Sequence, residues 1–449
     1  MPLMGGKRAM CPTIFREIAR LLPRPLWRDM TLLDGFLGGG SVSLYAKAQG
    51  FRVVATDIAE RAITVGRALI ENSRVRLAYE DVLRLAKDDG AAPGRVELQY
   101  SPSTFTKEQA RFLDRALGIA ASTRDTTKAA LIRFLAIRIA LLAHPMSQVR
   151  PGTIHRVATG EFESITPSCV RAYIDGPRLL RVGRLWGLAQ QINGGVFQGE
   201  GRVFHASILD VLPSIDATVF YADPPYPGVM SYEKEYRVID EILEGRSRPT
   251  SPFTAKGGAA MLDALFERAI HIPVWILSLG NAVVGIEELE AKMARFGRAT
   301  KSIAIKYAHL PAVATEEKKR ENREFLVVGW NAEAPLLRSV QGHRTSAWVD
   351  HADGDAVVED DPRFGGTKLP AFAPSLRDRD EEGEPGLAEK VAPLAGHAIP
   401  VVDDGLDDPD ALGAEPSLDL DGEGRVAFHG DDVPLAGGAE SSRAKEKRP

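Results

Sequence analysis

The sequence contains an Asp-Pro-Pro-Tyr tetrapeptide, formed by Asp223, Pro224, Pro225 and Tyr226, at the end of an apolar run that predicts a buried strand. Two successive prolines restrict the backbone, so the Asp223 carboxylate and the neighbouring carbonyl groups are held in one geometry. Groups held in this way can accept both hydrogens of an amino group attached to an aromatic ring. The nitrogen lone pair then becomes available for attack on an electrophile, while Tyr226 stacks on the ring.

A second candidate site is a glycine run, Gly38, Gly39 and Gly40, between a predicted strand at residues 31–35 and a helical pattern. Glycine lets the backbone approach a ligand closely, and the N-terminus of a helix is electropositive. The next predicted strand, at residues 51–57, ends in Asp57, where a doubly wound fold holds the hydroxyls of a ribose. The spacing departs from the dinucleotide fingerprint, so the pattern indicates an adenosine-containing ligand without a pyrophosphate.

These two motifs require a framework of alternating strands and helices. Further apolar runs at residues 217–222, 272–279, 300–308 and 323–330 predict strands of the same sheet. We therefore predict an α/β fold with a doubly wound, mostly parallel, Rossmann-like sheet. A helical middle region interrupts the alternation, with helices predicted at 106–120, where Thr106 and Gln109 form a capping box, at 128–143 and at 177–191.

Charge is distributed unevenly along the 449 residues. From residue 351 onwards there are 24 acidic and 10 basic side chains, so 37 of the 61 acids and 46 of the 56 bases precede it. This acidic part is rich in Pro, Gly and Asp and lacks helical or strand periodicity, so we predict a disordered tail that begins between residues 334 and 350. A solubilising role and competition with a polyanion for the basic part are both open.

The middle region carries the densest positive charge. Between residues 128 and 184 there are nine Lys or Arg side chains and three acids, a composition suited to a phosphate backbone, although a solvated helical face is the alternative. The proposed DNA-binding residues are Arg133, Arg138, Arg150, Arg156 and Arg171. We expect no metal site, because no His/Cys cluster has ligand spacing. The two cysteines, the lack of a secretory leader and the lack of a membrane span predict a cytoplasmic protein.

Together these motifs resemble the Dam-like, alpha-group adenine-specific DNA methyltransferases. The resemblance covers roughly residues 4 to 332 and includes the N-terminal Gly-Gly-Lys that ends at Lys7, the segment from Asp34 to Leu44, Asp57 and the tetrapeptide at Asp223. The order also agrees, with the cofactor loop first, the target-recognition region next and the catalytic tetrapeptide last. The family implies a methyltransferase sheet and transfer of a methyl group from S-adenosylmethionine to N6 of a flipped adenine in double-stranded DNA.

The resemblance also implies roles for individual residues. Lys7 would contact the methionine carboxylate of the cofactor, Asp34, Phe36 and the glycines would line its methionine and sulfonium side, and Asp57 would hold its ribose. Ser207 stands where many relatives have an acid for the cofactor's adenine amine, so Ser207 or Asp210 is expected to replace that acid. The middle region lacks the Asn-rich recognition segment of Dam itself, so no target sequence is assigned.

Other functions agree with fewer of these residues. Methylation at cytosine C5 needs a Pro-Cys nucleophile, and neither Cys11 nor Cys169 follows a proline. Methylation of cytosine N4 or of an RNA amino group uses similar tetrapeptides. A cofactor-binding but catalytically silent DNA-binding regulator is the alternative from another class, and the intact Asp223 and Tyr226 disfavour it.

The predicted organisation has four parts: a cofactor-binding part at 1–90, a helical, basic target-recognition insertion at 91–200, a catalytic part at 201–335 and the acidic disordered tail at 336–449. The expected partners are double-stranded DNA and a cognate restriction enzyme, with no membrane partner. The expected oligomeric state is a monomer or a weak dimer.

Overall fold

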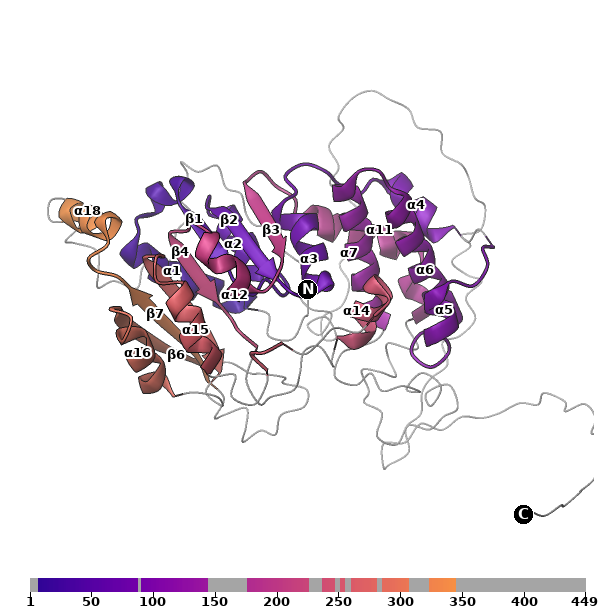
Figure 1. Ribbon diagram of the computed structural model, residues 1–449. Coiled ribbons are helices and arrows are strands. Elements are labelled where there is room, and N and C mark those ends of the chain that lie inside the picture. The colour runs from indigo at the N-terminus through magenta and orange to yellow at the C-terminus, as the bar shows by residue number, and fades with distance from the viewer. Residues whose placement is uncertain are drawn as a thin grey trace, which may run out of the picture. The chain divides into compact units, whose positions relative to one another are not determined.

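The computed structural model describes residues 7–87, 90–143, 176–225, 236–246, 251–254, 260–280, 285–306 and 323–344, all within the compact unit Met1–Asp378. Its framework is a seven-stranded sheet in the order β3-β2-β1-β4-β5-β7-β6. All neighbouring strands are parallel except β7, which is antiparallel to β5 and β6. This confirms the predicted α/β, mostly parallel fold (Figure 1). The strands are β1 (Thr31–Asp34), β2 (Arg52–Asp57), β3 (Gly201–His205), β4 (Val219–Ala222), β5 (Val274–Gly280), β6 (Ala299–Lys306) and β7 (Arg323–Trp330).

Helices precede, connect and follow these strands. The N-terminal helices and those near the sheet are η1 (Arg8–Met10), α1 (Cys11–Leu21), η2 (Arg24–Asp29), α2 (Ser41–Ala48), α3 (Glu60–Val65), η3 (Gly66–Ile70), α12 (Ile208–Val211), η4 (Leu212–Ser214), α15 (Ala260–Arg268), α16 (Ile286–Ala294) and α18 (Pro335–Arg344). The helical region comprises α4 (Tyr79–Ala86), α5 (Arg95–Tyr100), α6 (Lys107–Ser122), α7 (Thr126–Ala143), α10 (Gly176–Leu179), α11 (Val182–Asn193) and α14 (Arg237–Glu244).

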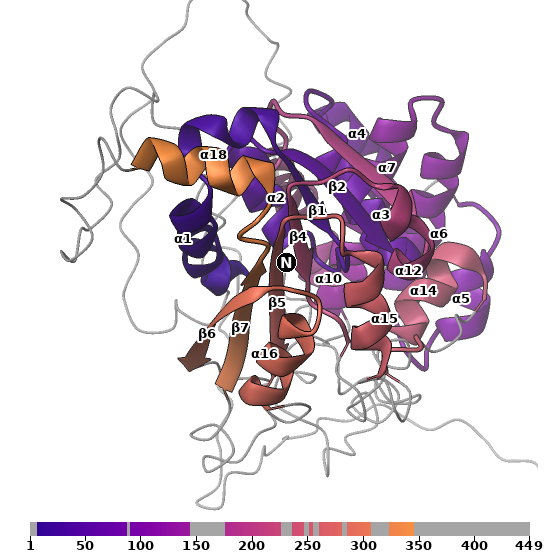
Figure 2. The same ribbon diagram turned by 60° about the vertical axis from the view of Figure 1, so that its left-hand side comes forward.

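Successive strand residues point to opposite faces of the sheet, and both faces are buried. One face, which includes Leu32 and Ile276, packs against α1, α2, η2 and α18. The other, which includes Leu33 and Trp275, packs against α12, α15 and α16. Figure 2 shows α1 and α18 on one side of the sheet and α15 and α16 on the other. This two-sided cover explains why the central strands are almost uniformly apolar in sequence.

A third core lies in the helical region, where α7 is the central helix. Its buried side chains surround the helix, from Ala130 to Ala143, and α3, η3, α6 and α11 all pack against it. The predicted capping box of α6 is confirmed, because Thr106 Oγ1 accepts from Gln109 N and Gln109 Oε1 accepts from Thr106 N. Within the described ranges, no helix combines the length and the apolar character that a membrane crossing requires.

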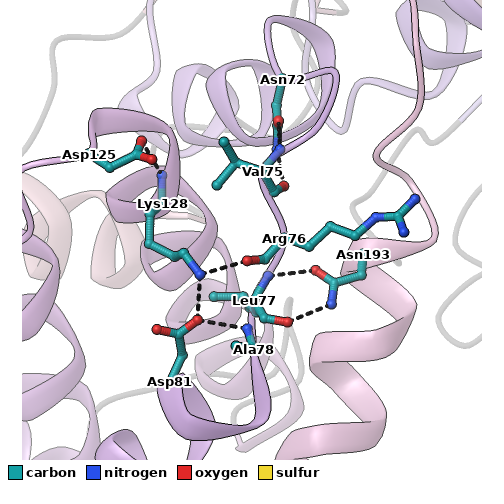
Figure 3. A network of polar contacts seen from close by, with 9 residues as sticks. All are labelled: Asn72, Val75, Arg76, Leu77, Ala78, Asp81, Asp125, Lys128 and Asn193. Atoms are coloured by element: carbon teal, nitrogen blue, oxygen red, sulfur yellow. Dashed lines mark hydrogen bonds and ion pairs between the residues drawn. The ribbon is translucent and has the colours of Figure 1, made fainter. Parts of the chain in front are cut away.

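Side chains hold the extended chain between η3 and α4 against the helical region (Figure 3). Asn193 of α11 accepts from Leu77 N at 2.8 Å and donates to Leu77 O at 2.9 Å, as a paired strand would. Lys128 of α7 donates to Arg76 O at 2.6 Å and to the Asp81 carboxylate at 2.5 Å. This segment therefore has backbone partners without belonging to a sheet, which satisfies groups whose burial would otherwise be costly.

The structure differs from the sequence-based expectations at two places. Residues 201–205 form the edge strand β3, which was not predicted because its exposed, polar residues give little apolar signal. Residues 336–344 were assigned to the disordered tail, yet they lie in α18, where Leu337 and Val340 are 2% and 6% exposed. Burial against the sheet stabilises this helix where composition alone predicted disorder. The remaining tail lies outside the described residues, and the boundaries at 90 and 200 stay predictions.

A pair of truncations tests whether the folded part ends with α18. A chain ending at residue 334 loses the buried Leu337 and Val340, each worth about 1.5–3 kcal/mol of unfolding free energy. We expect its melting temperature to fall by about 5 °C or more. A chain ending at residue 344 should melt as the full chain does in differential scanning calorimetry. Equal destabilisation of both chains would show that the acidic segment itself stabilises the core.

Candidate functional site

The site lies at the carboxyl ends of the parallel strands. In the sheet, β1 has β2 on one side and β4 on the other, so the strand order reverses direction between β1 and β4. Such a topological switch point leaves a crevice where doubly wound folds bind ligands. One pocket opens here, and its lining includes Asp34, the turn through Gly39, Asp57 and the segment Asp223 to Pro225. The two predicted motifs, 184 residues apart at Gly39 and Asp223, therefore meet in one cavity.

The glycine turn depends on backbone conformations that favour glycine. Gly38 and Gly40 have φ angles of 49° and 72°, in the left-handed region. The turn is tied to the neighbouring strand, because Leu37 N donates to Thr56 O at 3.0 Å and Gly38 N donates to an Asp57 oxygen at 2.9 Å. Gly38 and Gly39 line the pocket, whereas Gly40 caps α2 and is not among the lining residues.

Asp57 is held by the backbone on both of its carboxylate oxygens. Oδ2 accepts from Gly38 N, and Oδ1 accepts from Ala59 N at 2.8 Å. Each oxygen retains a further lone pair, and the side chain is partly exposed in the pocket. Asp57 is thus a fixed acceptor at the end of β2 that can receive additional hydrogen bonds from hydroxyl groups.

Asp34 is one of the two deeply buried acids of the pocket, at 1% exposure, the same as Asp240. Ser43 Oγ donates to its Oδ2 at 2.7 Å, and Phe36 N donates to its Oδ1 at 3.3 Å. Burial is the main cause that raises the pKa of Asp34 to about 7, and the nearby Asp223 and Asp57 carboxylates contribute in the same direction. A cation placed in this pocket would lower that pKa again.

Lys7 links the tetrapeptide to the start of strand β7. Its ammonium lies 2.8 Å from Asp223 Oδ1 and 3.2 Å from Glu324 Oε1. Glu324, at the start of β7, is completely buried and also accepts from Ser278 Oγ of β5 at 2.7 Å. The resemblance implied that Lys7 contacts a methionine carboxylate. In the structure its ammonium joins two carboxylates of the protein, which fixes the position of Asp223.

Several residues around the pocket were not found from the sequence. Arg61 and Asp240 form an ion pair across 179 residues, a separation at which sequence gives no signal. Phe253 packs edge-on against the predicted Phe36, with ring centroids 5.0 Å apart. Glu324 and Ser278 did give a signal, because each is a polar residue inside an otherwise apolar strand. The other lining residues that the sequence did not indicate include Tyr221 and Tyr236.

The two candidates for the adenine amine differ in position. Ser207 lines the pocket directly before α12, whereas Asp210 is exposed on α12 and is not among the lining residues. Ser207 is the N-cap of α12, whereas Asp210 lies nearly one turn further along the helix. Ser207 is therefore the candidate that the geometry favours.

The two described residues of the predicted DNA-binding set have internal partners. Arg133 donates to the buried Glu60 at 3.1 Å, and Arg138 donates to Gln191 at 2.8 Å. Burial lowers the pKa of Arg138 to about 10. Both lie on the central helix α7 and are partly buried, and their part in DNA binding stays a prediction. Arg150, Arg156, Arg171 and Tyr226 lie outside the described residues.

Removing the Lys7 ammonium should leave two carboxylates facing each other in a buried setting. We expect Lys7→Met to lower the unfolding free energy by about 3 kcal/mol, because breaking one partner of a buried ion pair strands the other charge. Chemical denaturation measures this change. The double variant Lys7→Met with Glu324→Gln should recover part of the loss. Equal stability of the single and double variants would mean that Glu324 does not depend on Lys7.

Comparison with known proteins agrees with this geometry. Residues 4–131 match the family model of the D12 class N6 adenine-specific DNA methyltransferases. The type II methyltransferase M2.HphI of Haemophilus parahaemolyticus is 28% identical over 306 residues, which cover 66% of this chain and 89% of that protein. The crystal structure of a precorrin-6y C5,15-methyltransferase from Geobacter metallireducens covers 69% of this chain and 90% of its own, at 10% identity and a TM-score of 0.19, too low to inform the site. Both matches support an assignment to the N6 adenine-specific DNA methyltransferases.

Proposed function

We propose that the chain transfers a methyl group from S-adenosylmethionine to N6 of an adenine that is flipped out of double-stranded DNA. The observation that supports this most directly is the shared pocket: the glycine turn after β1 and the Asp223 to Pro225 turn after β4 line the same cavity. A methyl donor held by the first turn is then next to an acceptor held by the second, and positioning of this kind is a large part of catalysis.

The charges of the pocket suit a cationic cofactor. Among the described lining residues there are four carboxylates, Asp34, Asp57, Asp223 and Asp240, and two cationic side chains, Lys7 and Arg61. Lys7 pairs with Asp223 and Arg61 pairs with Asp240. Within the described ranges, Asp34 and Asp57 receive backbone and hydroxyl hydrogen bonds but no ammonium or guanidinium. S-adenosylmethionine supplies a methyl group on a positively charged sulfonium, and it also carries an ammonium.

Individual residues then have distinct roles. Asp57 accepts from the two ribose hydroxyls, since its remaining lone pairs face the pocket. Asp34 and the Gly38 to Gly39 turn lie along the methionine and sulfonium side, and Phe36 with Phe253 forms an apolar wall. Ser207 is the partner for the cofactor's adenine amine.

Asp223 and the Pro224 carbonyl accept the two hydrogens of the target amine. The carboxylate reaches the pocket with 19% of its side chain exposed and is anchored from behind by Lys7. Because the hydrogens are held by oxygen acceptors, the nitrogen lone pair points toward the incoming methyl group. The cofactor would supply the methyl group, with its carbon–sulfur bond breaking as the new N–C bond forms, and the nitrogen would then pass one proton to the Asp223 carboxylate that holds it.

Stacking by Tyr226 offsets the cost of extruding the base. Flipping a nucleotide costs a few kcal/mol, and stacking on an aromatic side chain contributes about 1–3 kcal/mol per base. Arg150, Arg156 and Arg171 are the proposed phosphate contacts of the middle region, because Arg133 and Arg138 are already engaged within the helical region. A cognate restriction enzyme is the proposed partner, in keeping with the type II methyltransferase that this chain resembles.

Expression in a host without adenine methylation tests the function. Mass spectrometry of nucleosides from plasmid DNA should detect N6-methyladenine with the natural chain. Asp223→Asn should reduce it at least about hundredfold, as expected when a group that organises the reacting atoms is lost. Cofactor binding by this variant, measured by calorimetry, should persist. Methylated cytosine in the DNA, or unmodified DNA together with clear cofactor binding, would overturn the proposal.

Cofactor binding should depend on pH through Asp34. The pKa of this carboxyl is raised to about 7, and a cation favours its ionised form, so binding should tighten as the pH rises through 7. If the bound state is fully ionised, the dissociation constant is about tenfold larger at pH 6 than at pH 8. Calorimetry with natural chain and Asp34→Asn in parallel cancels the titration of the cofactor's own amine. The same pH dependence in both proteins would exclude Asp34 as its source.

A further inference from the structure

Helix α14 connects the pocket to the helical region. It is the first described element after the catalytic turn, and Tyr236 and Asp240 at its N-terminal end line the pocket. Its apolar side chains Ile239, Ile242 and Leu243 are buried in the core of the helical region. A rearrangement of either the helical region or the pocket must therefore displace α14, because packed interiors yield little to local strain.

On the pocket side, α14 is held by an ion pair with α3. Asp240 is 1% exposed, and Arg61 forms an ion pair with its carboxylate. The Arg61 guanidinium also lies over the Tyr236 ring, 4.3 Å from its centroid. Arg61 is on the first turn of α3, directly after the Asp57 to Ala59 turn of the proposed ribose site. The pair thus joins the cofactor side of the pocket to the helix that follows the catalytic turn.

On its other side, α14 is held by α5, away from the pocket. Arg95 donates to the carbonyls of Glu241 and Ile242 at 2.8 and 2.6 Å, where a cation complements the C-terminal end of the helix. Tyr100 Oη donates to the Glu241 carboxylate at 2.6 Å. None of the α5 residues lines the pocket. These contacts dock the same helix without touching either ligand, so they provide a matched control.

We infer that Arg61 and Asp240 are positioning residues that couple cofactor binding to DNA binding through α14. This inference rests on the proposed function, because it requires both ligands to bind this chain. A cofactor that orders the Asp57 turn orders α3 and, through the ion pair, α14 and the helical region that is proposed to contact DNA. By linkage, each ligand then tightens the binding of the other by the same factor. A buried ion pair has a defined geometry that apolar contacts lack, which suits such a link.

The test measures the affinity for DNA with and without S-adenosylhomocysteine, using plasmid fragments that carry no N6-methyladenine. For the natural chain we expect this demethylated form of the cofactor to tighten DNA binding at least about fivefold. In Asp240→Asn the ratio of the DNA affinity with S-adenosylhomocysteine to the affinity without it should fall to about one, because the charge that holds Arg61 is gone. Tyr100→Phe loosens the same helix from the other side and should keep the ratio of the natural chain.

A second variant keeps the test valid if Asp240→Asn fails to fold. Replacing both partners in Arg61→Met with Asp240→Val removes the ion pair and roughly keeps the volume, a change that buried pairs often tolerate. We expect this variant to keep its melting temperature and to lose the coupling. Coupling that survives in it, or that is lost equally in Tyr100→Phe, would overturn the inference. Absence of methylation by the natural chain is a separate result, which would overturn the proposed function alone.

Discussion

The arrangement of the site follows from one constraint, the mutual repulsion of carboxylates gathered at the end of a parallel sheet. Strands β1, β2 and β4 end side by side in Asp34, Asp57 and the turn at Asp223, and water is partly excluded there. Charges of one sign in such a place must be balanced. The protein does so with the Lys7 ammonium, with backbone N–H groups, and by shifting the pKa of Asp34 to about 7. The negative charge that is left uncompensated in the pocket suits the cationic ligand of the proposed function.

Lys7 shows how this balance also determines geometry. An ammonium between Asp223 and the buried Glu324 fixes the turn at Asp223, so that Asp223 does not depend on its two prolines alone. Glu324 is in turn held by Ser278. The antiparallel insertion of β7 beside β5 brings Glu324 and Ser278 together, which gives this departure from a parallel sheet a role at the site.

The helical region has its own core and reaches the pocket through α3 and α14. Figure 1 shows α3 and α7 between the sheet and the remaining helices of that region. The helical region therefore packs largely within itself, and the sheet and its motifs rest on the two other cores. Few elements join the helical region to the pocket, and the ion pair of Arg61 with Asp240 is one of the contacts between them.

The sequence by itself determined the features that depend on local chemistry. Apolar runs predicted the central strands, a capping box predicted the start of α6, and the motifs at Gly38 and Asp223 identified both sides of the pocket, because glycine and proline act on their own backbone. Only the tertiary structure decided which distant charges meet. Lys7 with Glu324, Arg61 with Asp240, and Arg133 with Glu60 are pairs between elements far apart in the chain. Composition predicted a basic surface on α7, whereas burial made that helix the centre of a core. Pairing and burial depend on how whole elements pack, and no short stretch of sequence encodes that packing.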